Sequence, residues 1–289
     1  MKNNLRRSAL YVPGDSERML QKCTTVASDV LILNLEDGVA LSRKRAARRN
    51  VAGAIQSSAY GDREIVVRVN PLSSETGMSD LAEIIPCNPD GVCLPKVEDV
   101  EEIRVADRSI LELEIRHGLP ESGIGLHAMI ESARGLLNAS RIASAVPRMS
   151  SLIFGSADYT NDVRCQPGDD RAELLFALQI MVTSARAAGI DAIDAPCFDI
   201  RNSDLLYREA VGARRLGFDG KSALHPDQLE IINRVFDVTD EEIAWAEQAL
   251  AELDAAENRG KALTTMEGKL IDNPHRAAAL RILRRRKSG

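Results

Sequence analysis

The sequence predicts an α/β protein, namely a (β/α)8 TIM barrel with a C-terminal helical extension. First, β-rich apolar runs alternate with amphipathic helical stretches, which is the pattern of a parallel sheet with helical crossovers. Second, the 289 residues suit one barrel of roughly 250 residues plus an appendage better than two small domains. Third, charged residues stand at the C-terminal ends of successive apolar runs, and the loops after the strands of such a barrel open on one face.

Each of the first four expected strands is an apolar run that ends at a turn or a charged residue. Pro13-Gly14 closes the first run, and Glu36, Arg68 and Lys96 stand at or just beyond the ends of the next three. These runs span residues 9–12, 30–35, 65–69 and 91–94. Stretches with helical periodicity follow them at residues 16–26, 42–55, 79–85 and 97–116.

The remaining four expected strands complete the barrel. The runs 125–130 and 151–154 are each followed by helical sequence, and Glu131 and Asp158 lie just beyond their ends. The last two strands are expected at 192–198 and within 217–224. The barrel domain is therefore expected to span residues 1–236.

Residues 237–289 form the expected C-terminal extension, which a barrel does not need. The segment Thr239-Asp240-Glu241-Glu242 is typical of a helix N-cap followed by an acidic first turn, so a helix is expected at 240–259. A loop or short extended arm at 260–273 and a final helix at 274–287 complete the chain.

Composition narrows the class of protein. The chain is 44% hydrophobic and 28% charged, as is ordinary for a globular enzyme, and its net charge of -6 argues against nucleic-acid binding. The five cysteines are an odd number with no CxxC pair, so neither a disulfide framework nor a zinc site is predicted. The basic start of the chain does not read as a signal peptide, and no apolar run approaches the ~18 residues of a membrane span. We therefore expect a cytoplasmic protein that binds no membrane.

The charged residues at the strand ends indicate the chemistry of the expected site. Glu131 and Asp158 together suit a hard cation such as Mg2+, with Mn2+ as an alternative, although both could simply be loop carboxylates that cap helices. Arg68 and Lys96 could hold a substrate carboxylate and polarise a carbonyl, or could form rim salt bridges to Glu36 or Asp37. A divalent ion beside an arginine stabilises an enolate or a 2-oxo acid, which points to carbon-carbon bond formation or cleavage.

Eight motifs in collinear order resemble the citrate lyase beta subunit family of the HpcH/HpaI aldolase superfamily, whose relatives include malyl-CoA and citramalyl-CoA lyases. The resemblance extends from residue 6 to about residue 283, so chance matching is excluded. The motifs are RRSALYVPG (6–14), LEDGVA (35–40), VRVN (67–70), LPKVE (94–98), MIESARGL (129–136), FGSAD (154–158), GFDGKSALHP (217–226) and GKLID (268–272).

The resemblance implies a role for each residue at the barrel mouth. Glu131 and Asp158 match the Mg2+ ligands of the family, and Arg68 matches the residue that binds the 2-oxo acid fragment. Glu36 would brace Arg68, and Asp37 would hold a metal-bound water.

The resemblance also assigns residues outside the metal site. Asp272 matches an aspartate that reaches a neighbouring subunit's active site and exchanges a proton with the α-carbon of the thioester. On local sequence alone, Asp272 could instead be the N-cap of the helix that starts at Pro274. The positions near the CoA moiety are Pro13, Arg18, Lys22 and Arg43.

The expected reaction is a Mg2+-dependent retro-Claisen cleavage of a 3-hydroxyacyl-CoA to acetyl-CoA and a 2-oxo acid, with citramalyl-CoA as first choice and malyl-CoA next. A homotrimer or hexamer is expected, with the extension docking on a neighbouring subunit. One alternative is the beta subunit of citrate lyase, which acts on citryl-acyl carrier protein and yields oxaloacetate. Two others are an aldolase for free 4-hydroxy-2-oxo acids and a non-catalytic barrel that serves as an assembly subunit.

Overall fold

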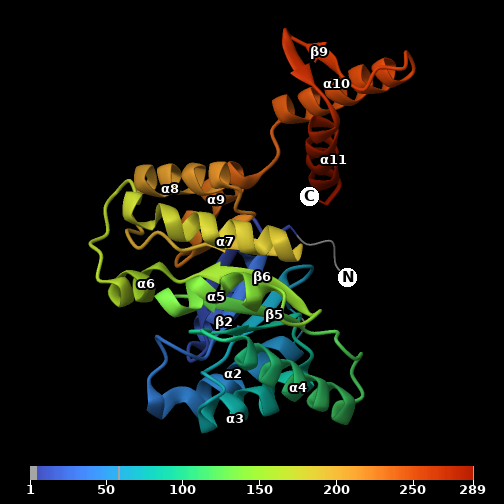
Figure 1. Ribbon diagram of the computed structural model, residues 1–289. Helices are drawn as coiled ribbons and strands as arrows, with labels where there is room; N and C mark the ends of the chain where they lie inside the picture. Colours follow the sequence, from blue (N-terminus) through green and yellow to red (C-terminus); the bar gives the residue numbers. More distant parts are fainter. Residues whose placement is uncertain (1–4, 58, 289) are drawn as a thin grey trace. The chain divides into compact units, whose positions relative to one another are not determined.

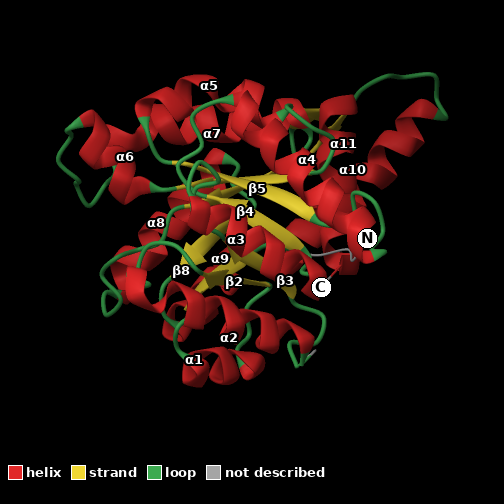
Figure 2. Ribbon diagram, turned by 90° about the horizontal axis from the view of Figure 1, so that it is seen from below, coloured by secondary structure: helices red, strands yellow, loops and turns green. Residues whose placement is uncertain are grey.

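Eight parallel strands close into a barrel in the computed structural model, which describes residues 5–57 and 59–288 (Figure 2). The strands pair in chain order, and β8 closes the ring by pairing with β1. They are β1 (Ser8–Pro13), β2 (Val30–Asn34), β3 (Glu64–Arg68), β4 (Gly91–Leu94), β5 (Gly125–Ile130), β6 (Met149–Phe154), β7 (Asp191–Asp194) and β8 (Gly220–Ala223). The predicted (β/α)8 class is confirmed.

Helices follow the strands and form the layer around the barrel (Figure 2). They are α1 (Glu17–Lys22), α2 (Lys44–Gln56), α3 (Glu75–Ile84), α4 (Val100–His117), α5 (Ala133–Ala143), α6 (Ser156–Val163), α7 (Leu175–Ala188), α8 (Ser203–Leu216) and α9 (Leu229–Phe236). Two helices, α6 and α7, lie between β6 and β7, so this connection is longer than a crossover with a single helix.

Alternation along the strands divides the apolar side chains into two layers. Along each strand, the apolar side chains that point inward fill the barrel interior, and those that point outward pack under the helices. The interior layer consists of Ala9, Val30, Ile32, Val66, Cys93, Met129, Ile153 and Ile193. Two residues beyond Ile32, Val66 and Met129 stand Asn34, Arg68 and Glu131, so the same alternation directs these polar side chains toward the C-terminal mouth.

The opposite, N-terminal end of the barrel carries a buried polar network. Arg6 pairs with Glu64 at 2.6 Å and with Asp191 at 2.7 Å. His127 lies nearby with only 2% of its surface exposed, and its Nδ1 is 2.8 Å from the hydroxyl of Ser151. These contacts pair the charges of Arg6 and Glu64, whereas Nε2 of His127 makes no hydrogen bond among the described residues and stands 3.6 Å from a Glu64 carboxylate oxygen.

Most element boundaries shift by a few residues from the prediction, and three differences have a clear structural cause or consequence. Helix α3 starts at Glu75 rather than at residue 79, because the Ser74 side chain accepts a hydrogen bond from the Gly77 N–H and caps the helix there. Strand β7 ends at Asp194. Residues 195–198, which were predicted to continue this strand, form a loop that contains Pro196. The arm expected at 260–273 contains an antiparallel hairpin, β9 (Thr264–Met266) and β10 (Lys269–Ile271).

The chain divides into two compact units, of which Arg6–Phe236 is the barrel and the second includes the chain from Asp237 onward. The second unit contains α10 (Asp240–Glu257), the β9–β10 hairpin and α11 (Asn273–Ser288), coloured orange to red in Figure 1. Thr239 and Glu242 form the capping box that starts α10. Its core consists of Ala246, Ala249, Leu253, Met266, Ile271 and Ala279. Within residues 5–57 and 59–288, no helix combines the length and the apolar character needed to cross a bilayer.

Candidate active site

A cavity of about 400 Å³ opens at the C-terminal ends of the barrel strands. Five residues predicted to belong to the site line it: Pro13, Asp37, Arg68, Glu131 and Asp158. The remaining lining residues are Tyr11, Asn34, Gly38, Met129, Phe154, Gly155, Ser156, Ala157, Pro196, Phe198 and Leu224. The cavity therefore lies where a barrel of this class keeps its active site.

The carboxylate of Glu131 is held at the end of β5. Its Oε1 accepts a hydrogen bond of 2.7 Å from the backbone N–H of Lys96. Burial raises the pKa of this carboxyl to about 7, and the nearby negative charge of Asp158 also raises it, against the lowering effect of Arg68. Glu131 and Asp158 are thus close enough to interact electrostatically.

Asp158 reaches the cavity from the first turn of α6, which begins directly after β6. Gly155 at this junction lies against Glu131, because a Cβ on Gly155 would stand 2.4 Å from Glu131 Oε2 and 2.5 Å from Glu131 Cβ. Only a glycine allows the backbone to approach the carboxylate this closely. The strand-to-helix turn thereby brings the two carboxylates to the same side of the cavity.

Lys96 holds Glu131 through an uncommon backbone conformation. Its φ of 52° lies in the left-handed region, which residues other than Gly, Asn and Asp seldom adopt. The turn after β4 consequently points the Lys96 N–H at Glu131, while its side chain extends toward the loop after β2.

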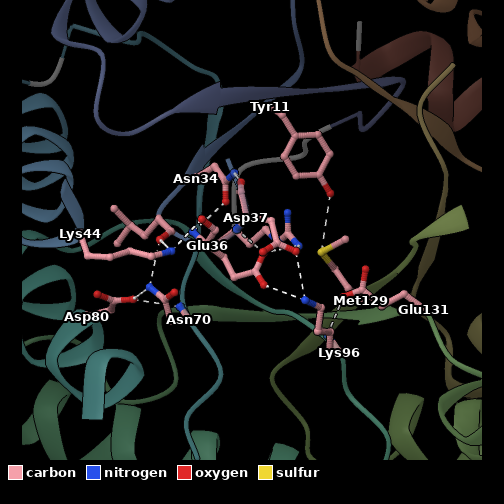
Figure 3. Close-up of polar contacts among 12 residues, drawn as sticks. Tyr11, Asn34, Glu36, Asp37, Lys44, Asn70, Asp80, Lys96, Met129 and Glu131 are labelled. Carbon is pink, nitrogen blue, oxygen red and sulfur yellow. Dashed lines mark hydrogen bonds and ion pairs between the residues drawn. The ribbon is translucent and has the colours of Figure 1, made fainter. Parts of the chain in front are cut away.

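Glu36, Asp37, Arg68 and Lys96 form one ion cluster (Figure 3). Buried Glu36 accepts from Arg68 Nη2 at 2.5 Å and from Lys96 Nζ at 3.2 Å, and Lys96 also reaches Asp37 at 3.0 Å. Burial of Asp37 opposes its ionisation, yet the hydrogen bond and charge of Lys96 outweigh it and lower the Asp37 pKa. The Lys96 ammonium therefore makes the rim ion pair considered above as the alternative to a substrate contact.

The loop that carries Glu36 is anchored by residues that the sequence reasoning missed (Figure 3). Lys44 Nζ donates to the backbone carbonyls of Leu35 and Glu36 at 2.7 and 2.8 Å. Asn70, just after β3, donates to the Leu35 carbonyl at 3.0 Å and to Asp80 at 2.7 Å. Asn70 belongs to the VRVN motif, so its position after a strand was the available signal, whereas nothing local marks Lys44 or Asp80.

The donor set fits a magnesium ion. Glu131 and Asp158 line the same cavity and supply carboxylate oxygens, which are the ligands that Mg2+ prefers. Among the residues that the structure describes, no group of three or more His, Cys, Asp or Glu side chains could enclose a metal. A two-carboxylate site of this kind leaves the other coordination positions to water and substrate oxygens.

Asp272 belongs to the second unit, at the start of α11. Its backbone carbonyl accepts from the N–H groups of His275 and Arg276, so it occupies the N-terminal cap of the helix. Its carboxylate Oδ1 lies 2.7 Å from His275 Nδ1. His275 is a partner that the sequence reasoning missed, and spacing of three residues on a helix start was its only signal.

The residues expected near CoA lie around the β1–α1 turn. Pro13 ends β1 and lines the cavity, whereas Arg18 and Lys22 are exposed on α1. Arg43 is held by Asp15, pairing with its carboxylate at 3.0 Å and donating to its carbonyl at 2.9 Å.

Comparison with known proteins identifies the family. Residues 7–226 match the family model for HpcH/HpaI aldolase/citrate lyase, and residues 176–288 match that for a C-C bond lyase of the TIM-barrel fold. The citrate lyase subunit beta of Haemophilus influenzae is 36% identical over 99% of this chain and 98% of its own length. The (3S)-malyl-CoA thioesterase of Cereibacter sphaeroides is 34% identical over 96% of this chain and 93% of its own length.

Solved structures give the same result. The protein CitE of Mycobacterium tuberculosis, in complex with magnesium, acetoacetate and coenzyme A, is 28% identical with a TM-score of 0.76, covering 96% of this chain and 97% of that one. RipC of Yersinia pestis is 31% identical with a TM-score of 0.69, covering 84% of this chain and 100% of that one.

Proposed function

This chain belongs to the HpcH/HpaI aldolase/citrate lyase family and is a magnesium-dependent carbon-carbon lyase, and on that premise we propose that it cleaves a 3-hydroxyacyl-CoA thioester. The products would be acetyl-CoA and a 2-oxo acid, and the substrate would be of the citramalyl-CoA or malyl-CoA type. The observation that carries the proposal is a single cavity lined by the carboxylates of Glu131 and Asp158 together with the guanidinium of Arg68.

Glu131 and Asp158 would hold the metal, with Mg2+ as the principal ion and Mn2+ as a substitute. When bound, the ion would supply positive charge for the hydroxyl and carboxylate oxygens that become the 2-oxo acid. Lys96 keeps Glu131 in place through its N–H, and Asp37 lies at the cavity edge where it can bind a water.

Arg68 would bind the oxygens of the 2-oxo acid half. Its buried Nε has no hydrogen-bond partner among the residues described, so the guanidinium retains donor capacity beyond its contact with Glu36. Glu36 would set the orientation of Arg68, and Lys96 would balance the remaining charge of Glu36 and Asp37.

Asp272 would protonate the α-carbon of the thioester as the carbon-carbon bond breaks, and would remove that proton in the reverse direction. The carboxyl sits on a helix start in the second unit, and 40% of its side-chain surface is exposed. We propose that it acts in the site of a neighbouring subunit of a homotrimer or hexamer.

The CoA moiety would lie along the β1–α1 turn. Pro13 lines the cavity at the end of β1, and the exposed cations Arg18, Lys22 and Arg43 follow it in sequence. Exposed cations beside the cavity entrance would suit the phosphate groups of CoA. The five cysteines are all free thiols, which fits action in a reducing cytoplasm.

The second candidate is the beta subunit of a citrate lyase, acting on citryl-acyl carrier protein and yielding oxaloacetate. The 36% identity to the Haemophilus influenzae subunit over nearly its whole length favours it. Both candidates use the same metal and arginine, and they differ in the carrier of the thioester.

The test is an assay of the purified chain alone with Mg2+ and either citramalyl-CoA or malyl-CoA. Release of pyruvate or glyoxylate together with acetyl-CoA, abolished by EDTA, is the expected result. Release of free CoA without acetyl-CoA would instead identify a thioesterase. Activity only with citryl-acyl carrier protein would favour the second candidate, and activity with a free 4-hydroxy-2-oxo acid would identify an aldolase.

Two substitutions of the same type calibrate this assay. Glu131→Gln removes the charge of the proposed metal ligand and should abolish turnover. Glu101→Gln, on the exposed face of α4, removes an equal charge from a residue that does not line the cavity and should leave turnover unchanged.

A further inference from the structure

Tyr11 presents a hydroxyl group to the active-site cavity without a strong acceptor. The side chain extends from β1 and lines the cavity. Its hydroxyl donates to the sulfur of Met129 at 3.7 Å, which is a weak acceptor (Figure 3). Ser222 lies close enough to act on the phenol, and that interaction lowers the Tyr11 pKa, so the Ser222 hydroxyl acts there as a donor and does not accept the phenolic proton. A buried phenol normally finds a partner, so this donor is underused in the protein alone.

The phenol lies between the two charged groups of the proposed site. The Arg68 guanidinium carbon stands 5.9 Å from the centroid of the Tyr11 ring, in cation-π range. The charges of Arg68 and Glu131 both act on the Tyr11 hydroxyl, and burial, the largest effect, raises the pKa of the phenol. Tyr11 therefore keeps its proton at neutral pH, as a phenol ordinarily does, and can donate it to an acceptor in the cavity.

Two neighbouring side chains that line the cavity are thus incompletely matched: the Tyr11 hydroxyl has a weak sulfur acceptor, and the Nε group of Arg68 has no acceptor among the described residues. A single neutral acceptor would leave one of them unmatched, whereas a carboxylate has two oxygens with several acceptor sites. We propose that the Tyr11 hydroxyl donates a hydrogen bond to the carboxylate of the 2-oxo acid half of the substrate, beside Arg68. This inference rests on the proposed function and adds a residue that binds the substrate.

The test measures binding rather than turnover. Pyruvate and glyoxylate are titrated by calorimetry into the intact protein with Mg2+, alongside pyruvamide, which has the same keto group but no carboxylate. Tyr11→Phe keeps the ring beneath Arg68 and removes only the hydroxyl. Because a hydrogen bond to a charged group contributes about 10- to 100-fold in affinity, Tyr11→Phe should weaken binding of both oxo acids by that factor. Pyruvamide binding should change little.

Tyr207→Phe on the exposed surface of α8 is the matched control and should bind all three ligands as the wild type does. Thermal unfolding of each variant distinguishes a substrate-binding role of the hydroxyl from a packing role. A packing role would lower the melting temperature and leave the preference for pyruvate over pyruvamide intact. Unchanged oxo-acid affinity in Tyr11→Phe, or a wild type that binds neither oxo acid, would overturn the inference. A wild type that binds pyruvate normally but cleaves no thioester would overturn the proposed function alone.

Discussion

Charge at the barrel mouth is arranged around one buried carboxylate. Glu36 is only 4% exposed, yet it carries the contacts of both Arg68 and Lys96. An unpaired buried charge costs several kcal/mol, so two cations at hydrogen-bonding distance make its ionised form tolerable. In return, Glu36 fixes the direction of Arg68, which is the group expected to meet the substrate.

Replacing Glu36 by Gln should therefore allow the Arg68 side chain more freedom of orientation without leaving a cavity at position 36. The variant keeps the side-chain shape but loses the ionic hydrogen bond, which is worth about 1.5 to 3 kcal/mol. We expect the KM for the hydroxyacyl-CoA to rise by roughly 10- to 100-fold, with a smaller effect on kcat. Steady-state kinetics beside Glu101→Gln would measure this change, and unchanged kinetics would show that Glu36 does not position Arg68.

His127 gives the protein a defined response to acid. Burial lowers the pKa of this histidine to about 4, since the imidazole is enclosed at the N-terminal end of the barrel. In the unfolded chain the same group takes up a proton near pH 6.5. The unfolded state therefore binds more protons between these two values, and the free energy of unfolding should fall as the pH decreases from about 6.5 to 4.

The shift in the His127 pKa corresponds to a loss of about 3 kcal/mol in the free energy of unfolding over that pH range. Urea denaturation of wild type and His127→Asn at pH 7 and pH 4.5 would measure it, and the variant should lose less stability on acidification. His117→Asn, at the exposed end of α4, is the matched control and should behave as the wild type. Equal losses in wild type and His127→Asn would contradict the assignment.

At the scale of elements, the site depends on the turns that connect strands to the helices that follow them. β6 passes directly into α6 through Gly155, and Lys96, two residues beyond the end of β4, has a left-handed backbone conformation. The first junction brings Asp158 beside Glu131, and the second directs an N–H at Glu131. The proposed metal site would therefore depend on two turns rather than on the strands themselves.

Gly155→Ala tests this arrangement, because its new methyl group would stand 2.4 Å from the Glu131 carboxylate. Either the carboxylate or the backbone must shift. We expect weaker Mg2+ binding by about tenfold or more and a loss of roughly 1 to 3 kcal/mol in stability. Calorimetric titration with Mg2+ and denaturant unfolding would record both effects.

Gly53→Ala is the matched control for this substitution. Gly53 lies in α2 with open space around its added Cβ, so alanine there should stabilise the helix by up to about 1 kcal/mol and leave Mg2+ affinity unchanged. Normal Mg2+ affinity in Gly155→Ala would show that the close approach at the β6–α6 turn does not control the metal site.

The sequence predicted the elements better than the contacts between them. Charges after apolar runs were enough to place Arg68 and Glu131 at one end of the barrel, because alternation along a strand is a local property. The left-handed turn at Lys96, the donation by Lys44 and the unmatched hydroxyl of Tyr11 were not predictable, because each depends on segments distant in sequence. The roles of these residues in catalysis stay predictions.

At the scale of the molecule, the proposed chemistry is divided between two units. The cavity with Glu131 and Asp158 belongs to Arg6–Phe236, whereas Asp272 starts α11 in the unit that includes the chain from Asp237 onward. That second unit has its own apolar core and ion pairs, including Arg276 with Asp254 and Glu257. Under the proposed function, this unit would carry Asp272 to the barrel of another subunit.

Mixing two inactive variants decides whether it does. Glu131→Gln lacks the proposed metal ligand, and Asp272→Asn lacks the proposed acid, so each alone should show almost no turnover. If Asp272 acts in a neighbouring site, subunit exchange places an intact Glu131 beside an intact Asp272 in about a quarter of the sites of a randomly mixed ring. Activity of the equimolar mixture should then rise to about that fraction of the wild-type value. If the acid acts within its own chain, no mixed assembly contains a complete site, and the mixture stays as inactive as its components.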